Sequence, residues 1–314
     1  MPVSPTYPGV YIQEVSSGVR TVAGVPTSIA AFVGRTRRGA VEEPTACFGF
    51  GEFTRRFGGL WSEGPLSYAV DDFFGNGGGQ ALAVRLFKPA ADDDDGIADL
   101  TVGALKLRAA DPGAWGNELR ARIDHPADAT AAASIAARHG LEADDLFDLT
   151  VEDAGSGARE TFRNLTIRDD GGERRVDRVL EAGSSLVRLA VLGGGGPDLP
   201  AARPVATDPL LAPDAWPGAE NGNDGLALTP SDFIGDEDAK TGMHALLKAD
   251  IFNLLCIPPD ARGGTLDISV REKAAALCAK RRAFYIVDPP AGWDDNPANA
   301  AATAKAAQLN PATA

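Results

Sequence analysis

The chain has little cysteine and a shortage of positive charge. Cys47, Cys256 and Cys278 are the three cysteines in 314 residues, and each lies in an apolar stretch without a CxxC pair. They cannot build a disulfide framework, which favours free thiols in a reducing compartment. Lys and Arg number 30 against 44 Asp and Glu, giving a formal charge of −14. This balance argues against binding to duplex nucleic acid, which requires neutralised phosphates, and against adsorption to an anionic membrane.

Long hydrophobic runs are also missing. No run of 18 apolar residues occurs, so the sequence predicts no membrane-spanning segment. The first residues, MPVSPTYPGVYIQEV, lack the basic and apolar regions of a secretory signal. By contrast, 44% of the residues are hydrophobic, and glycine and proline together are abundant at 36 and 22 residues. This composition predicts a folded chain with many turns and extended segments.

Motifs that would carry catalysis or hold a cofactor are lacking as well. The segment Gly75–Gln80 is glycine-rich, but it precedes a strand rather than opening a helix, so we predict a turn that ends a helix. The acidic segments 92–95 and 221–225 do not have EF-hand spacing and are expected to be solvated loops. The three histidines are far apart, and no GxSxG occurs. We therefore expect no catalytic, cofactor-binding or metal-binding residues, and no enzyme.

Residues 1–26 are predicted to form an extended arm. Proline and glycine punctuate it, and residues 10–15 (VYIQEV) are rich in strand-forming types. A strand so close to the terminus has no hairpin partner next to it in the sequence. It must pair with a distant strand, either in its own fold or in another chain.

Residues 27–100 and 206–314 have the rhythm of an α/β domain. Short apolar runs predict buried strands, and apolar residues at helical spacing predict helices between them. The expected strands are 28–34, 81–87, 252–257 and 283–287; the expected helices are 51–57, 65–74, 237–248, 266–282 and 297–309. A helix between two apolar strands favours a parallel crossover. Residues 88–100, with four consecutive aspartates, are predicted to be a linker.

Residues 101–205 are predicted to be rich in strands. The expected strands are 105–109, 118–123, 146–152, 160–167 and 186–192, with a short helix at 177–182. Several alternate apolar and polar residues, which favours an antiparallel sheet or sandwich with one solvated face. The predicted fold class is therefore mixed α+β and α/β: an α/β domain split by a β-rich, sandwich-like insertion, with an extended N-terminal strand arm.

Three segments, Tyr7–Val15 (YPGVYIQEV), Val25–Gly34 (VPTSIAAFVG) and Asp111–Leu119 (DPGAWGNEL), together resemble contractile tail sheath proteins. These proteins occur in contractile phages and in phage-like injection systems. Phe252–Pro259 and Phe284–Pro290 resemble two later strands of the family, so the resemblance spans nearly the whole chain. The YPGVY and PGAWGN motifs are fairly specific when they occur together.

The resemblance implies a fold and a role. It implies a conserved sheath domain at 27–100 and 206–314, and an outer inserted domain at 101–205. It implies a structural subunit that polymerises as stacked hexameric rings around an inner tube and contracts to drive the tube through a target envelope. The implied partners are other copies of the chain, the inner tube protein, and baseplate and cap proteins, without nucleic acid or direct membrane insertion. The implied location is the bacterial cytoplasm during assembly, and then a phage tail or phage-like injection particle.

The resemblance also implies a role for the arm, which would add a strand to a neighbouring subunit. The residues expected at this contact are Tyr7, Val10, Tyr11, Ile12 and Val15. The alternative is a strand that completes the sheet of its own subunit. Five arginines are candidates for polar contacts between subunits or, equally, for ordinary solvated positions: Arg35, Arg37, Arg38, Arg55 and Arg56.

The end of the chain departs from the family pattern. Sheath proteins usually continue past the Ala-rich helix with further conserved sequence, a tube-facing helix and a C-terminal arm. We therefore expect the second part of the α/β domain to be incomplete, as in a truncated chain or a split or short variant that relies on a partner. The alternative function is a short sheath-like cap or baseplate adaptor of the same kind of particle.

Overall fold

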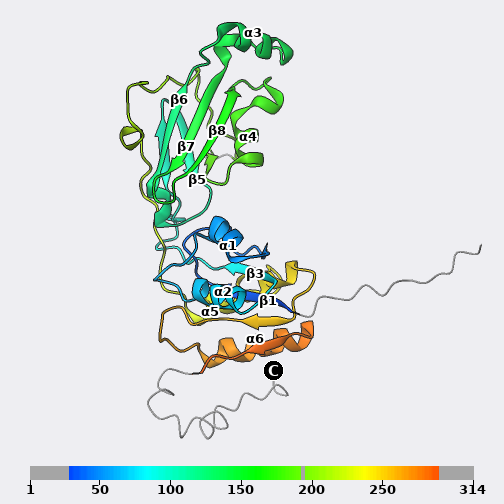
Figure 1. Cartoon of the computed structure of the whole chain (residues 1–314). Helices are drawn as coiled ribbons and strands as arrows, with labels where there is room; N and C mark the ends of the chain where they lie inside the picture. Colours follow the sequence, from blue (N-terminus) through cyan, green and yellow to red (C-terminus); the bar gives the residue numbers. More distant parts are fainter. Residues whose placement is uncertain (1–27, 192–194, 290–314) are drawn as a thin grey trace, which may run out of the picture.

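The chain forms two units, one above the other, joined by a narrow waist (Figure 1). The computed structural model describes residues 28–191 and 195–289. The lower unit contains a five-stranded sheet and the upper unit two three-stranded sheets, so the mixed α and β composition predicted from the sequence is present. The predicted arm, with Tyr7, Val10, Tyr11, Ile12 and Val15, and the predicted helix at 297–309 lie outside the described residues.

The five-stranded sheet has the order β11–β10–β1–β3–β2. Its strands are β1 (Ile29–Gly34), β2 (Thr45–Cys47), β3 (Gln80–Arg85), β10 (Leu254–Cys256) and β11 (Phe284–Ile286). All neighbours are parallel except β2, which runs antiparallel to β3. All six residues of β1 are buried. This is the environment of a central parallel strand, and it explains why β1 is a continuous apolar run rather than an alternating one.

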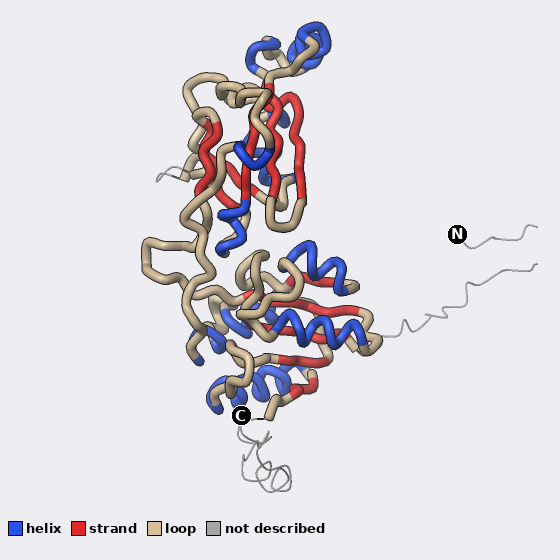
Figure 2. The backbone as a smooth tube through the Cα atoms, turned by 60° about the vertical axis from the view of Figure 1, so that its left-hand side comes forward, coloured by secondary structure: helices blue, strands red, loops and turns tan. Residues whose placement is uncertain are grey.

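Helices cover both faces of this sheet. They are α1 (Phe50–Phe57), α2 (Leu66–Gly75), α5 (Pro230–Ile234), the 3-10 helix η5 (Gly242–Lys248) and α6 (Ile268–Arg281). The helices α1 and α2 pack on one face, and α5, η5 and α6 pack on the other. Asp267 begins α6, where its side chain accepts a hydrogen bond from the Ser269 amide at 2.8 Å. Figure 2 shows helices in front of and behind this sheet.

The helix predicted at 237–248 is present only in its second half, as the 3-10 helix η5, and the prediction is wrong for 237–241. The helix α5 begins earlier, at a capping box between Thr229 and Asp232, and ends at Gly235. The chain then makes a closed loop, in which the Asp236 amide donates to Thr241 Oγ1 at 2.8 Å. Only η5 follows, from Gly242. Gly235 and Gly242 approach so closely that a Cβ on either would lie within 3 Å of the other's backbone, so no helix can run through this segment.

The upper unit consists of two antiparallel sheets, β4–β5–β9 and β6–β7–β8. Its strands are β4 (Asp99–Val102), β5 (Leu105–Ala109), β6 (Leu119–Asp124), β7 (Phe147–Asp153), β8 (Ala158–Leu165) and β9 (Val187–Leu189). Burial alternates along β6 and β7, as predicted for strands with one solvated face. One hydrophobic core joins the two sheets.

Two elements of the upper unit were not predicted. The strand β4 lies partly in the predicted linker. Its Leu100 and Val102 are buried, while Asp99 and Thr101 are exposed. The helix α3 (Ala129–Arg138) is capped by Asp128, whose side chain accepts hydrogen bonds from the amides of Thr130 and Ala131. The helix α4 (Val176–Gly183) agrees with the short helix expected at 177–182. The remaining short 3-10 helices are η1 (Ala114–Glu118), η2 (Ala143–Asp145), η3 (Gly172–Arg174) and η4 (Pro213–Ala215).

A strap of residues 204–220 continues the hydrogen bonding of the upper unit beyond residue 205. The Thr207 amide donates to the Ile123 carbonyl at 2.8 Å, and the Ala219 amide donates to the Leu119 carbonyl at 2.9 Å. Trp216 on this strap is 6% exposed and has two guanidinium groups, those of Arg122 and Arg159, 5.8 and 5.3 Å from its ring. Only after the strap does the chain return to the lower unit.

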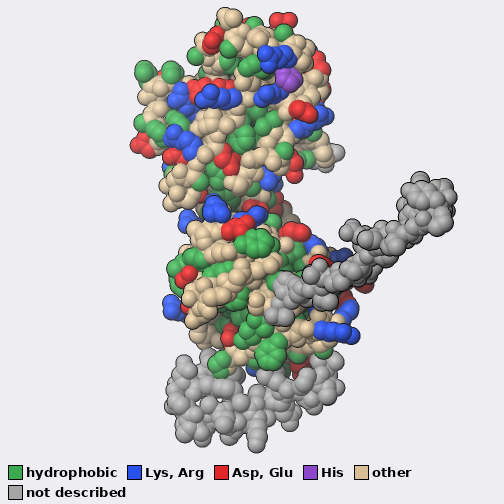
Figure 3. Space-filling model, turned by 45° about the vertical axis from the view of Figure 1, so that its right-hand side comes forward, with side chains coloured by type: hydrophobic (Ala, Val, Ile, Leu, Met, Phe, Trp, Pro, Cys, Tyr) green, Lys and Arg blue, Asp and Glu red, His purple; other side chains and the backbone are tan. Residues whose placement is uncertain are grey.

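The surface of the two units differs in character (Figure 3). Side chains of both charge signs are interspersed over the upper unit, whereas hydrophobic side chains are gathered on the lower one in this view. Within residues 28–191 and 195–289, no helix combines the length and the apolar character needed to cross a membrane.

Candidate functional site

The carboxyl edge of the five-stranded sheet is the place to look for a site. In open parallel sheets, ligands bind where neighbouring strands send their connections in opposite directions. Here β1 connects to β3 on one side, and β10 connects to β11 on the other, so this point lies between β1 and β10. Arg35 follows β1, Arg85 ends β3, and Asp260 follows β10 by four residues. The sheet therefore brings three charged residues to the edge where an enzyme of this class would hold its substrate.

Arg35 and Asp260 form an ion pair across this point. Arg35 Nη1 lies 3.5 Å from Asp260 Oδ2, and both side chains are 14% exposed. Arg35 also donates to the Asp224 carbonyl at 3.2 Å and lies over the Trp61 ring at 5.1 Å. Asp260 in turn accepts a hydrogen bond from the Leu228 amide at 3.2 Å. Both charged groups are therefore used by the protein itself, and they tie residues 224–228 to the sheet.

Arg85 makes a second tie from inside the core. Its side chain is fully buried and donates to two carbonyls, those of Gly39 and Pro112, each at 2.8 Å. Burial lowers the pKa of Arg85 to about 10, and Asp111 opposes this shift. The guanidinium therefore stays charged at neutral pH. Because Pro112 lies between β5 and η1 of the upper unit, this side chain joins β3 directly to that unit.

The DPGAWGN segment is the centre of the junction. Trp115, 3% exposed, donates to the Pro112 carbonyl at 3.2 Å. The side-chain amide of Asn117 makes two reciprocal hydrogen bonds with the backbone of Gly222, both at 2.8 Å. The Ala114 amide donates to the Asp224 side chain at 2.9 Å. These contacts join residues 111–117, between β5 and β6, to the returning chain at 222–224, 105 to 110 residues later.

The glycines of this motif are required by close packing. Gly113 has φ +137°, and a Cβ there would lie 2.5 Å from Trp115 Cδ1 and 2.7 Å from the Arg37 carbonyl oxygen. A Cβ on Gly116 would lie 2.7 Å from the Cβ of Ala98. Only glycine leaves room for the chain here. The two glycines of the motif therefore stand where this segment passes close to two others, at Arg37 and at Ala98.

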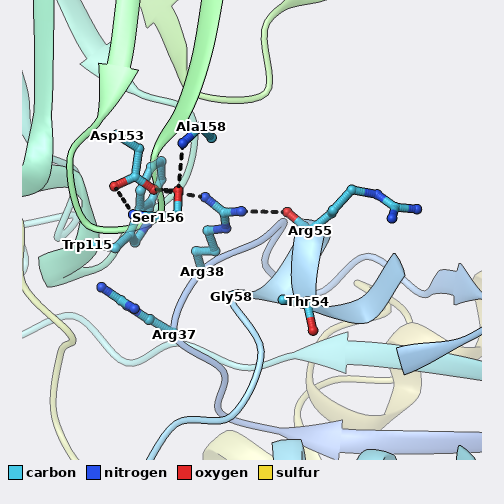
Figure 4. Close-up of a pocket in the computed structure, with 9 residues that line it drawn as sticks. All are labelled: Arg37, Arg38, Thr54, Arg55, Gly58, Trp115, Asp153, Ser156 and Ala158. Atoms are coloured by element: carbon cyan, nitrogen blue, oxygen red, sulfur yellow. Dashed lines mark hydrogen bonds and ion pairs between the residues drawn. The ribbon is translucent and has the colours of Figure 1, made fainter. Parts of the chain in front are cut away.

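A cleft of about 240 Å³ lies between α1 and the turn that joins β7 to β8 (Figure 4). Arg38 points into it, 3.3 Å from Asp153 Oδ2, donates to the Arg55 carbonyl at 2.7 Å and lies 5.5 Å from the Trp115 ring. Asp153 also accepts hydrogen bonds from the amide and the hydroxyl of Ser156. Arg38 therefore holds the upper unit to α1. The side chains of Thr54 and Arg55 point away from these groups.

Burial is the main cause of the pKa shifts of three groups in the lower unit and at the junction: Asp111, Cys256 and Cys47. Burial raises the pKa of the Asp111 carboxyl, against the opposing charges of Arg85, Arg188 and Arg38. Burial likewise raises the pKa of Cys256 to about 12 and that of Cys47 to about 11, so these thiols are poor nucleophiles. Within the part of the chain that the structure describes, no group of three or more metal-binding side chains is arranged to hold an ion.

The glycine-rich segment and the two acidic segments noted in the sequence make defined hydrogen bonds in the structure. Gly75–Gln80 ends α2, where the amides of Gly77 and Gly78 donate to the carbonyls of Phe74 and Phe73, as predicted for a helix-ending turn. The two acidic segments meet each other, since the Asn223 side chain donates to both carboxylate oxygens of Asp94. Asp94 and Asn223 are therefore part of the junction, whereas Asp92, Asp93 and Asp95 are exposed, as predicted for a solvated loop.

Three of the five arginines considered for contacts between subunits form ion pairs within the chain. Arg35 and Arg38 bind within the chain, and Arg56 pairs with Glu52 one helical turn away at 3.1 Å. Sequence reasoning missed Arg85, although a charged residue at the end of an otherwise apolar strand was a visible signal. It also missed the pairing of residues 117 and 222, which nothing local in the sequence could indicate.

Comparison with known proteins leaves the family open. No family model matches the chain, and no curated protein matches it. Among solved structures, a sheath tail protein from Listeria innocua matches with a TM-score of 0.49 at 14% identity, over 84% of this chain and 46% of that one. A sheath tail protein from Desulfitobacterium hafniense matches with a TM-score of 0.46 at 16% identity, over 87% of this chain and 50% of that one. The chain spans about half the length of these structures, and the likeness is limited to the general, sheath-like course of the chain.

Proposed function

We propose that this chain is a structural subunit of a contractile tail sheath. The motifs YPGVY and DPGAWGN support the proposal by their resemblance to sheath proteins. The observation that carries it is the state of the sheet's carboxyl edge. Where an open α/β enzyme would bind its ligand, Arg85 donates to Pro112 of the second unit, and Arg38 nearby pairs with Asp153 of that unit, so both arginines fasten the second unit to the sheet domain. This edge serves as a mechanical joint, which suits a subunit that transmits force.

In this proposal the two units have different tasks. The five-stranded unit is the conserved sheath domain that packs in the cylinder, and the β-rich unit between its two halves is an insertion that faces outward. The contacts among the sheet, residues 111–117 and residues 222–224 keep the insertion in one orientation while the sheath changes length. The net charge of −14 is compatible with a protein that contacts other proteins rather than nucleic acid.

The arm makes the contact between subunits in this proposal. Residues Val10–Val15 add a strand to a neighbouring copy, and head-to-tail contacts of this kind build rings and helical cylinders. The inner tube, the baseplate and the cap are the other partners. Assembly takes place in the bacterial cytoplasm, and the finished cylinder belongs to a phage tail or a phage-like injection particle.

Electron microscopy of purified particles tests the proposal. We expect long striated cylinders that contain many copies of the chain. Deletion of residues 1–20 should abolish these polymers and leave a folded monomer, as judged by circular dichroism and a cooperative melting transition. Polymers that persist without the arm would refute its role.

Copy number separates the two structural roles. Many copies per particle support the sheath, whereas about one ring per particle would indicate the short cap or baseplate adaptor instead. A chain found only as a dispersed monomer, with no particle, would contradict both.

A further inference from the structure

Arginine side chains in the interior of this chain have a common use. Four of them donate hydrogen bonds to backbone carbonyls of other segments: Arg35, Arg38, Arg85 and Arg281. Arg271 of α6 is only 8% exposed, yet its Nε has no hydrogen-bond partner among the described residues. A buried donor without an acceptor is costly, so this side chain indicates a group that the isolated chain does not supply.

Arg271 lines a pocket of about 570 Å³ at the carboxyl edge of the sheet, between the starts of α5 and α6. We call it the α5–α6 pocket. Asp260 lines it too, and within the described part of the chain its Oδ1 is buried and has no hydrogen-bond partner. The other walls are mostly apolar: Leu228, Pro230, Phe233, Leu266, Ile268 and Val270. Apolar walls with a few unused polar groups are typical of a binding site.

The charges around this pocket balance. Asp260 is paired with Arg35 at 3.5 Å. Asp267 accepts hydrogen bonds from the amide and the hydroxyl of Ser269, and its negative charge offsets the positive charge of Arg271. The pocket therefore suits a neutral group with a carbonyl acceptor and an N–H donor better than it suits a free ion. A peptide backbone that carries an apolar side chain has this chemistry.

The strap on the upper unit exposes a segment with the complementary groups. Residues 208–215 are all exposed, and the side chain of Leu210 is 91% exposed. Among the described residues, none donates a hydrogen bond to the carbonyls of Pro209 and Leu210. The Asp208 side chain accepts from the Leu210 amide at 2.9 Å, and the prolines at 209 and 213 restrict the backbone. The segment therefore loses little conformational entropy when it binds.

We propose that residues 208–215 of one copy of this chain bind in the α5–α6 pocket of a second copy. Leu210 enters between the apolar walls, and Arg271 donates to the free carbonyls at 209 and 210. Asp260 accepts from an N–H of the same segment. Arg271 then holds carbonyls as the other four arginines do.

The contact joins different surfaces of the two copies. Thr207 and Ala219 are hydrogen-bonded to β6, which keeps the segment between them on the upper unit, whereas α5 and α6 belong to the lower unit (Figure 1). Contacts between unlike surfaces can repeat head to tail and build rings or filaments. This inference rests on the proposed assembly of the chain with copies of itself, and it names one contact in that assembly.

A pair of cysteines tests the contact. Leu210→Cys and Ile268→Cys are introduced together into the full chain, because Ile268 lines the pocket and is 45% exposed. After oxidation with copper phenanthroline we expect a ladder of disulfide-linked oligomers. The matched control combines Leu210→Cys with Phe48→Cys, since Phe48 is 68% exposed and lies outside the pocket. The pair at 210 and 268 should link at least five-fold more chain than the control pair.

Three outcomes would overturn the contact. Equal yields from the two pairs would show random collision. A disulfide within one chain would show that the segment reaches its own pocket, and no disulfide in a chain with a normal melting transition would show that it reaches neither.

A second measurement uses the unmodified chain. A fluorescent peptide of residues 207–214 should bind the full chain saturably, as measured by anisotropy. Arg271→Gln should weaken this binding about ten-fold, because a hydrogen bond from a charged donor is lost. Arg262→Gln is the control and should leave the affinity unchanged, since Arg262 is exposed and lies over the Tyr68 ring instead. Equal affinity for the parent chain and Arg271→Gln, or no binding at millimolar peptide, would contradict the proposal.

This contact and the sheath role fail separately. Striated cylinders without the disulfide between positions 210 and 268 would overturn the contact and leave the sheath subunit in place. The disulfide ladder without cylinders would support the contact and count against the sheath.

Discussion

The lower and upper units bury their strands in different ways. All six residues of β1 are buried, and the strand reads as a continuous apolar run. Along β6, burial alternates between buried and half-buried residues. The difference follows from connectivity, because parallel strands need helical crossovers on their faces, whereas antiparallel strands joined by turns can leave one face to water.

The ion pairs at the junction are also more buried than those of the upper unit. At the junction below, Arg35 and Asp260 are each 14% exposed. In the upper unit, Arg108 pairs with Asp95 and Asp99, whose side chains are 55% and 57% exposed. Exposed pairs contribute little to stability, while a buried charge that loses its partner costs several kcal/mol. The comparison teaches that the charges that matter most in this acidic protein are the few at the joint between the units.

The largest effect is expected from Arg85→Ala. Each of its two hydrogen bonds from a charged donor is worth ~1.5–3 kcal/mol, and the cost of burying the guanidinium opposes them, so we expect a loss of about 3 kcal/mol in the free energy of unfolding. The matched control is Arg108→Ala on the exposed face of β5, with an expected loss of about 0–1 kcal/mol. Urea unfolding of both variants measures the difference. Equal losses would remove the distinction between the joint and the surface.

The next effect is expected from Gly113→Ala. The new Cβ would meet Trp115 and the Arg37 backbone, and φ at this position is +137°. We expect a loss of about 2–3 kcal/mol in the free energy of unfolding, from overlap and backbone strain together. The control is Gly157→Ala in the turn between β7 and β8, where φ is +72° but nothing lies within 4 Å of the added Cβ. There the strain alone should cost about 1 kcal/mol. Thermal melting compares the two.

The smallest effect concerns the pH dependence of stability, which should have opposite signs at Asp111 in the junction and at Asp170 in the upper unit. Burial raises the pKa of Asp111, so the folded chain binds this proton more tightly than the unfolded chain does, and stability falls as pH rises through the Asp111 pKa. Hydrogen bonding by Arg168 lowers the pKa of Asp170 in the upper unit, so its stabilisation is present above the unfolded pKa and is lost as pH falls. Unfolding of Asp111→Asn and Asp170→Asn between pH 3 and pH 7 should therefore deviate from the parent chain in opposite directions. Deviations of the same sign would contradict this account.

Much of the local structure could be predicted, because it depends on nearby residues. The apolar run at 28–34 is β1, and the helical pattern at 266–282 is α6. The prediction was wrong at 237–241, where the close approach of Gly235 to Gly242 forms a loop before η5. It missed α3, whose Asp128 cap was the available signal. Of the joint, the motif DPGAWGN was noticed for its resemblance, but its contacts were not foreseen.

The sequence by itself determined where most of the strands and helices form and which faces they bury, because hydrophobic period, turn residues and caps act over a few residues. It also determined the absence of familiar catalytic motifs. Only the tertiary structure decided that Asn117 meets Gly222 and that Arg85 reaches Pro112. These contacts join residues from 27 to more than 100 positions apart. Such pairings are selected by the packing of whole elements, because the entropy of loop closure changes only slowly with length and so favours no particular distant partner.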